Sequence, residues 1–256
     1  MKKNVNISYP VEGNSEFSEI EDESFWFKHR NNIFFDKISK YSPKDPFYDI
    51  GGGNGFISSF LQMNGLDTIL IEPGLQGIEK AKNRGLKNTF HGVLNDFDFS
   101  KSGLMRAAGC FDVIEHIEND IKFVSDIYNR MEVGAYFYVS VPAHNLLWSY
   151  EDIDAGHFRR YSLSQISDVL TVNRFRIIYK SYIFSFLPLP IFLTRTIKYK
   201  FKFLGRSKVN HKKDHVKNKG ISKSILSKIL GWEYNRISQN KSIPIGSSCF
   251  IIAIKD

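Results

Sequence analysis

The sequence predicts a doubly wound α/β fold: a mostly parallel seven-stranded sheet, helices on both faces and an antiparallel C-terminal edge strand. From residue 47 onward, short apolar segments alternate with segments of helical periodicity, which is typical of a parallel sheet. A run of glycines at 51–55 lies directly between the first such strand and the first helix, where open α/β sheets bind ligands. The chain closes on the pattern of a buried strand at 247–255.

Before the sheet, residues 16–40 have apolar positions at helical spacing, namely Phe25, Ile33, Phe34 and Ile38, and they predict an N-terminal helix. Two X-Pro pairs after residue 41 end that pattern. We therefore expect residues 1–44 to form a helical cap. Its basic start is followed by no apolar stretch, so we expect no signal peptide.

The following elements are assigned in chain order. Strands are predicted at 47–50, 67–72, 88–93, 105–111, 135–142 and 247–255, and helices at 56–63, 75–83 and 117–131. The strand at 105–111 has the weakest pattern, because Arg106 and two alanines dilute it. A final run of two strands would form an antiparallel pair at the edge.

Residues 174–238 are irregular. A strongly apolar segment is cut by Pro188 and Pro190, continues into a basic run, and ends in a short helical pattern at 221–232. We expect the main domain to comprise 45–182 and 239–256, with 183–238 as an insertion before the last strand.

The basic residues concentrate in this insertion. The net charge is +8, and 195–219 holds ten lysines and arginines against the single acid Asp214. The apolar part, 183–194, is short and broken by prolines, so it fits a segment lying on an anionic membrane surface better than a membrane span. An RNA-binding surface and a solvated loop are the alternatives. Two cysteines make no disulfide framework, which favours the reducing cytoplasm, with peripheral membrane contact through 183–219.

The glycine segment follows a strand with the spacing Asp49-x-Gly51-x-Gly53-x-Gly55. Glycines tolerate positive φ and let a ligand approach the backbone. Dinucleotide enzymes use G-x-G-x-x-G, but here the third glycine comes one residue early and Phe56 stands in its place. This register disfavours a nicotinamide cofactor. At the end of the next strand, Glu72 could accept both hydroxyls of a ribose.

The glycine segment resembles motif I of class I S-adenosylmethionine-dependent methyltransferases. The segment 110–120 is similar to the stretch that follows their fourth strand, and 25–30, 141–148 and 156–161 are similar to pieces of one subgroup. Members often act on glycans, lipid-linked intermediates or other small acceptors.

The resemblance implies the cofactor site. Asp49, Gly51, Gly52, Gly53 and Gly55 would surround the methionine half of the cofactor. Glu72 and Pro73 would hold the ribose, and Asp96, or equally Asn95, would bind the adenine. Phe111 and the residues after it would pass beside the sulfonium. Arg30 would reach the cofactor carboxylate while Trp26 closes over it; the alternative is a core Trp26 and a solvated Arg30.

The predicted catalytic residues are His116, His157 and Asp112, with either imidazole acting as the base for a hydroxyl acceptor. Asp112, Glu115 and His116 lie within one expected helical turn and, with His157, could hold Mg²⁺ or Mn²⁺. The pattern resembles metal-assisted O-methyltransferases, including small-RNA terminal methylases, although those more often carry Glu at the first position. The alternative is that Asp112 and Glu115 cap a helix over a packed His116. Arg159 and Arg160 would suit an anionic acceptor or pair with acids at 151–154.

The function expected from these features is O-methylation of a sugar, lipid-linked or other small acceptor. Two alternatives remain open: an RNA methyltransferase with a divalent metal, which the basic run favours, and a catalytically silent methyltransferase-like binding domain.

Overall fold

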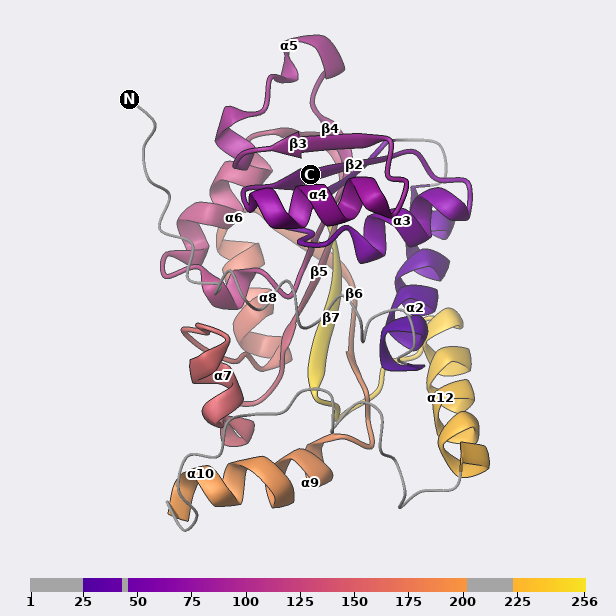
Figure 1. Ribbon diagram of the computed structural model, residues 1–256, viewed down its shortest axis with the longest axis vertical. Coiled ribbons are helices and arrows are strands. Elements are labelled where there is room, and N and C mark those ends of the chain that lie inside the picture. The colour runs from indigo at the N-terminus through magenta and orange to yellow at the C-terminus, as the bar shows by residue number, and fades with distance from the viewer. Residues whose placement is uncertain (1–24, 43–45, 202–222) are drawn as a thin grey trace.

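The computed structural model describes residues 25–42, 46–201 and 223–256 (Figure 1). The predicted cap residues 1–24 and most of the basic run, 202–222, lie outside these ranges. The sheet strands are β1 (Phe47–Ile50), β2 (Thr68–Glu72), β3 (Asn88–His91), β4 (Met105–Phe111), β5 (Met131–Pro142), β6 (Phe175–Ile183) and β7 (Ser248–Lys255). The helices that cover or flank it are α2 (Phe25–Tyr41), α3 (Phe56–Met63), α4 (Leu75–Asn83), α6 (Asp120–Tyr128), α7 (Tyr150–Asp154), α8 (Leu163–Val172) and α12 (Lys223–Ser238).

These strands form one sheet in the order β3-β2-β1-β4-β5-β7-β6, which confirms the predicted fold class. The pairs from β3 to β5 are parallel, and β7 runs antiparallel to both of its neighbours. The C-terminal strand is therefore antiparallel as expected, but it lies between β5 and β6, and β6 forms the edge. Ser248 pairs with both Pro142 and Ile183, so the start of β7 lies at the same end of the sheet as the carboxyl ends of β5 and β6.

Helices cover both faces of the sheet (Figure 1). α6 and α8 pack on one face through Val124, Ile127, Ile166 and Leu170. α2, α3 and α12 contribute to the hydrophobic core on the other face. Ile33, Phe34 and Ile38 of α2 are fully buried there, as their helical spacing predicts, and each such side chain contributes about 1.5–3 kcal/mol on burial.

Some element boundaries differ from the prediction. Helix α6 begins at Asp120 rather than 117, because the Asn119 side chain accepts a hydrogen bond from the Lys122 amide and caps it. Residue 131, predicted as helix, opens β5. The weak pattern at 105–111 is confirmed as strand β4, which lies between two parallel neighbours and is almost entirely buried.

The predicted insertion contributes to the core. After β6 the chain forms α9 (Pro188–Ile191), a π-helical segment (Phe192–Thr196) and α10 (Ile197–Phe201), and α12 then packs on α2 through the buried Ile237. Among the helices of the described ranges, none has the length and apolar character needed to cross a membrane.

A buried glutamate joins three of these elements. Glu233 of α12 hydrogen-bonds to His29 Nε2 of α2 at 2.9 Å and accepts hydrogen bonds from the amides of Phe184 and Ser185, both at 2.8 Å. Although burial opposes it, these hydrogen bonds hold the pKa of Glu233 below its usual value. Glu233 therefore fixes α12 and the segment after β6 against α2.

We expect Glu233→Ala to lower the free energy of unfolding by about 2–3 kcal/mol, because two buried amides would lose a charged acceptor. Urea denaturation followed by circular dichroism measures this. Asn235→Ala, an exposed change on the same helix, serves as the control and should cost less than about 0.5 kcal/mol. Equal stability of the two variants would contradict the structural role of Glu233.

Candidate functional site

The glycine segment turns sharply at the carboxyl end of β1. Gly51, Gly53 and Gly55 have φ of 73°, 55° and 67°, in the left-handed region that favours glycine. Gly55 is the N-cap of α3, so the loop leads directly into a helix start, where the first amides have no acceptor within the helix. The sheet order reverses between β1 and β4, and this loop lies at that switch point, where doubly wound sheets bind their ligands.

Asp49 lies behind the loop and is fully buried. A Cβ built on Gly52 would stand 2.3 Å from Asp49 Oδ2, so only glycine fits between this carboxylate and the backbone. Oδ2 accepts a hydrogen bond from the Ser58 hydroxyl at 2.7 Å, and Oδ1 has no hydrogen-bond partner among the described residues. Burial raises the pKa of Asp49 to about 6.

Glu72 ends β2 directly beside the loop. Its Oε2 accepts a hydrogen bond from the Gly53 amide at 3.0 Å, and its Oε1 accepts one from the Gly74 amide at 2.7 Å. Burial raises the pKa of Glu72, while these two amides oppose that shift. A Cβ on Gly77 of α4 would stand 2.7 Å from the Gly53 carbonyl, so α4 packs closely on the same loop. The structure therefore brings the predicted loop together with Glu72, the residue predicted to bind the ribose.

Three further predicted cofactor residues lie near the ends of β2 and β3. Pro73 follows Glu72, and its carbonyl contacts His91 Nε2 at 3.1 Å. Asn95 and Asp96 lie on a 3₁₀ turn (Leu94–Asp96) after β3, and both are exposed. The Gly92 amide donates to the Glu72 carbonyl at 3.1 Å, which holds the start of this turn against β2. All three can therefore border a ligand beside Glu72.

Phe111 and the residues that follow it lie in three different surroundings. The ring of Phe111 stacks on Phe34 with centroids 4.4 Å apart and belongs to the core. Val113 instead lies against the loop, since a Cβ on Gly51 would stand 2.9 Å from its Cγ2. Asp112 has a φ of 56°, and its Oδ2 accepts a hydrogen bond from Arg30 Nη1 at 2.6 Å.

Arg30 therefore comes close to the predicted cofactor site, but in a salt bridge. Its side chain is 15% exposed, so the alternative of a solvated surface charge is wrong. The guanidinium also lies 5.0 Å from the centre of the Phe27 ring. Asp112 Oδ1 accepts a further hydrogen bond from Ser140 at the end of β5.

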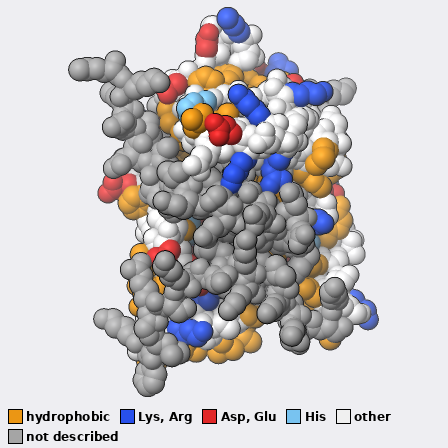
Figure 2. Space-filling model, in the orientation of Figure 1, with side chains coloured by type: hydrophobic (Ala, Val, Ile, Leu, Met, Phe, Trp, Pro, Cys, Tyr) orange, Lys and Arg blue, Asp and Glu red, His pale blue; other side chains and the backbone are white. Residues whose placement is uncertain are grey.

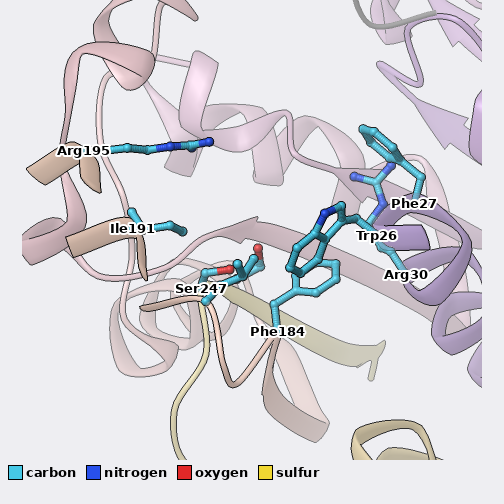
Figure 3. Close-up of a pocket in the computed structure, with 9 residues that line it drawn as sticks. Trp26, Phe27, Arg30, Phe184, Ile191, Arg195 and Ser247 are labelled. Atoms are coloured by element: carbon cyan, nitrogen blue, oxygen red, sulfur yellow. The ribbon is translucent and has the colours of Figure 1, made fainter. Parts of the chain in front are cut away.

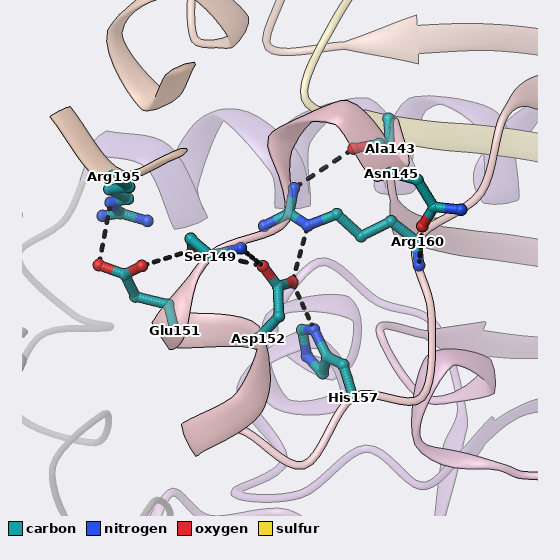
Figure 4. Close-up of polar contacts among 8 residues, drawn as sticks. All are labelled: Ala143, Asn145, Ser149, Glu151, Asp152, His157, Arg160 and Arg195. Carbon is teal, nitrogen blue, oxygen red and sulfur yellow. Dashed lines mark hydrogen bonds and ion pairs between the residues drawn. The ribbon is translucent and has the colours of Figure 1, made fainter. Parts of the chain in front are cut away.

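His116 and His157, which are far apart in the sequence, form an edge-to-face pair with ring centroids 4.7 Å apart. Burial, and secondarily the neighbouring His157, lowers the pKa of His116 to about 4. His157 Nδ1 lies 2.9 Å from Asp152 Oδ1 (Figure 4). Although burial opposes it, His157 and Arg160 lower the pKa of Asp152, so this carboxylate only accepts hydrogen bonds. His157 Nδ1 is then the donor, and in the neutral imidazole Nε2 is the acceptor.

Asp152 also positions the surrounding loop (Figure 4). It accepts a hydrogen bond from Arg160 Nε at 2.7 Å and one from the Ser149 amide in a capping box at the start of α7. The alternative pairing of Arg160 with an acid at 151–154 is therefore confirmed, whereas Arg159 pairs with Asp120 at 2.9 Å. Sequence reasoning named Asp152 only as a possible partner of the arginines. It missed the contact with His157 and the helix cap, for which the signal was the spacing Ser149-x-x-Asp152.

Glu115 is 1% exposed, and neither of its carboxylate oxygens has a hydrogen-bond partner in any other described residue. Burial, with the nearby charge of Asp112, raises its pKa well above the usual value. Glu115, His116 and His157 each offer a ligand atom, and these three atoms lie within 4.8 Å of one another. This is the arrangement of a candidate metal site.

Asp112 does not join that group. The sequence analysis expected Asp112, Glu115 and His116 on one helical turn, but the left-handed Asp112 turns the chain before a short 3₁₀ helix at Ile114–His116. The capping alternative is also wrong, because Asn119 caps α6.

A cavity of about 260 Å³ lies at the same end of the sheet (Figure 3). Its walls come from α2, the segment after β6, the α9 region and the start of β7. Aromatic and aliphatic side chains predominate, with one arginine from α2, Arg30, and one from the π-helical segment, Arg195. The sequence analysis did not identify Arg195 or Phe184 as site residues.

Comparisons with known proteins add family information. The family model of a methyltransferase domain matches residues 26–179, and no curated protein matches the chain.

Three solved structures illustrate the fold similarity. A methyltransferase from Thermotoga maritima, described as S-adenosylmethionine-dependent and as a possible histamine N-methyltransferase, shows 14% identity and a TM-score of 0.53 over 96% of this chain and 100% of its own. The plantazolicin methyltransferase in complex with SAH shows 15% identity and a TM-score of 0.56 over 94% and 89%. The Haemonchus contortus phosphoethanolamine N-methyltransferase 2 in complex with S-adenosyl-L-methionine shows 16% identity and a TM-score of 0.58 over 98% and 58%. At these identities, the similarity shows the fold alone.

Proposed function

This chain belongs to the methyltransferase domain family, and from that premise we propose that it transfers a methyl group from S-adenosylmethionine to a small acceptor, by O-methylation of a sugar, lipid-linked or other small molecule. The observation that carries the proposal is the open glycine backbone between Asp49 and Gly55, hydrogen-bonded to the carboxylate of Glu72.

The residues present fit this cofactor. A carboxylate offers about four acceptor positions, so the two amide hydrogen bonds of Glu72 leave room for two ribose hydroxyls. The buried Asp49 Oδ1 has no partner in the described part of the chain, which suits a ligand ammonium group. The positive φ angles of the loop favour glycine, and glycine has no side chain that would occupy the space of the methionine half. Asn95, Asp96 and Pro73 would border the adenosine.

When bound, the cofactor supplies an activated methyl group. The protein must align the acceptor and remove its proton. We assign proton removal to His157, because Asp152 fixes its tautomer and stabilises the imidazolium that forms. His116 lies against that ring and, with its low pKa, stays neutral, so it adds no opposing charge.

Calorimetry with S-adenosylhomocysteine, with NAD as the comparison ligand, tests the cofactor assignment. We expect heat with the former and none with NAD, whereas the opposite result would exclude the proposal. Labelled S-adenosylmethionine with fractionated cell extract would then identify the acceptor. Cofactor binding without turnover on any fraction would support a catalytically silent binding domain, and a labelled RNA would support the RNA alternative.

A second candidate function is metal-assisted O-methylation. The carboxylate of Glu115 favours it, since neither oxygen has a hydrogen-bond partner in any other described residue. Glu115, His116 and His157 would hold the ion, with Asp152 orienting His157 from behind as acids do for metal-bound histidines. A divalent ion there would polarise the acceptor hydroxyl. His157 would then be a ligand rather than the base.

The variant Glu115→Met separates these two candidates. Without metal we expect it to raise the free energy of unfolding by about 1–4 kcal/mol, because it replaces a buried acid that has no partner in any other described residue. If the group binds metal, Mn²⁺ stabilises the native protein and not the variant. Thermal unfolding with EDTA and with Mn²⁺ measures both effects. Glu118→Gln, an exposed change nearby, should follow the native protein in both. A native protein that Mn²⁺ leaves unchanged would exclude the metal candidate.

A further inference from the structure

The cavity of about 260 Å³ (Figure 3) shares Arg30 with the predicted cofactor residues. Arg30, which lines it, forms a salt bridge with Asp112 in the segment after β4. Ser247 and Ser248 line it from the start of β7, at the carboxyl ends of β5 and β6. The cavity therefore lies beside the segment after β4, which the resemblance places next to the sulfonium.

Its walls are apolar over most of their extent. Trp26 stacks on Phe186 with centroids 5.0 Å apart and meets Phe184 edge to face at 5.6 Å. Leu187 and Ile191 add aliphatic surface. A cavity of this size lies just below the usual range of roughly 300–1,000 Å³ for ligand pockets. It therefore fits one small apolar group, such as a single ring.

Among the described residues, two cations and no acid line this cavity. Arg30 Nε is buried without a hydrogen-bond partner among the described residues. On the other side of the cavity lies Arg195 (Figure 3), which pairs with Glu151 at 3.5 Å, a looser contact than the 2.6 Å between Arg30 and Asp112. Glu151 and Asp152 are neighbours on α7, so the same short helix supports Arg195 and His157 (Figure 4).

We infer that this cavity binds the methyl acceptor, and that the acceptor is a small amphipathic anion. Its apolar body contacts Trp26 and Leu187, and its carboxylate or phosphate group binds Arg195, whose guanidinium forms paired hydrogen bonds with either group. The identification of the ligand as the methyl acceptor rests on the proposed methyltransferase function. The anion site itself can be tested separately.

The test uses simple probes that share a benzene ring: phenyl phosphate, benzoate, benzyl alcohol and benzylamine, titrated into the full chain by ligand-observed NMR. We expect the two anions to bind at least about tenfold more tightly than the alcohol, as a charge-assisted hydrogen bond predicts, and the amine not to bind. The relative affinities of phenyl phosphate and benzoate distinguish the two anionic groups.

Arg195→Gln should weaken phenyl phosphate binding about tenfold and leave benzyl alcohol binding unchanged. Lys228→Gln, an exposed change on α12 that likewise removes one positive charge, should alter neither. Equal binding of the alcohol and the anions, or an Arg195→Gln variant that binds phenyl phosphate as well as the native protein, would overturn the inference. S-adenosylhomocysteine is titrated independently, so failure of the cofactor assignment is seen as loss of that binding alone.

A separate observation concerns the outer face of the helices after β6. Leu189, Leu193 and Phe201 are 66%, 53% and 69% exposed, at spacings of multiples of four residues. The exposed Lys198 and Lys200 lie among them. In Figure 1, α9 and α10 lie across one end of the molecule, and Figure 2 shows hydrophobic side chains along that same lower edge with basic ones beside them.

We propose that this outer face, defined by Leu189, Leu193 and Phe201 with the two lysines, lies on an anionic lipid bilayer. Exposed apolar side chains flanked by lysines match the interface between acyl chains and anionic head groups. Charge complementarity is strengthened by the sequence that follows, which has seven further lysines and arginines between 202 and 219.

Co-sedimentation of the full chain with vesicles tests this proposal. We expect binding to phosphatidylcholine vesicles that contain phosphatidylglycerol, and much less to phosphatidylcholine alone. Leu193→Asp should abolish that binding, whereas Val172→Asp, at a residue of α8 that is 67% exposed, should retain most of it. Unchanged binding of Leu193→Asp, or binding to single-stranded RNA with none to vesicles, would contradict the proposal.

Discussion

Replacing Glu72 with alanine is expected to weaken the binding of S-adenosylhomocysteine on the order of 100–1,000-fold, since a hydrogen bond to a charged group contributes about 1.5–3 kcal/mol and several are lost together. The side chain links the loop to the proposed ligand, because it accepts from the Gly53 amide at 3.0 Å and from the Gly74 amide at 2.7 Å. Without it, the ribose loses its acceptors and the loop loses its support. Isothermal titration calorimetry measures the affinity.

Two variants make this result specific. Glu79→Ala removes the same charge from an exposed position on α4 and should leave the affinity unchanged. Glu72→Gln keeps one acceptor oxygen and should be intermediate. If Glu72→Ala and Glu79→Ala bound the ligand equally well, Glu72 would have no part in cofactor binding.

The arrangement of the proposed cofactor residues could be predicted because its determinants are local. The backbone at positions 51, 53 and 55 has positive φ angles, which require glycine. The sequence places these glycines between a strand and a helix. Glu72 comes at the end of the next parallel strand, and parallel neighbours bring their carboxyl ends to one edge of the sheet. Pattern and spacing therefore suffice to bring these residues together.

The proposed acceptor cavity depends on contacts between distant segments, which spacing does not encode. Arg195 lies on a π-helical segment that follows two prolines. No regular periodicity therefore predicted which way its side chain points. Asp112 shows the same limit at short range. Its expected helical neighbours were Glu115 and His116, but its positive φ turns its carboxylate to Arg30.

The pairing of His116 with His157 is an intermediate case. The sequence singled out both imidazoles, while their meeting at 4.7 Å depends on how the loop after β5 folds back. That loop is held by the Phe158 amide, which donates to the Glu115 carbonyl at 2.8 Å, and by Asp152 within α7. The pairing of Asp152 with His157 was missed because the histidine lies outside the helix of Asp152, where helical spacing gives no guide.

These contacts lead to the second large prediction. Once the acceptor is known, His157→Gln is expected to lower the rate of methyl transfer to a hydroxyl by roughly 10²–10⁴-fold, the usual contribution of a general base. Asp152→Asn should lower it by a similar factor, because an amide at that position no longer fixes the tautomer or stabilises the imidazolium. Steady-state rates with labelled S-adenosylmethionine measure both.

The decisive comparison is between rate and cofactor affinity. A base acts on the acceptor, so both variants should bind S-adenosylhomocysteine as the native protein does, and Asp154→Asn, at an exposed position of the same helix, should keep the native rate. Loss of cofactor binding together with activity would indicate damage to the fold around Asp152, where Arg160 and the Ser149 amide also depend on the carboxylate. A native rate in His157→Gln would show that another group removes the proton, and His116, which lies against His157, would be the next residue to replace.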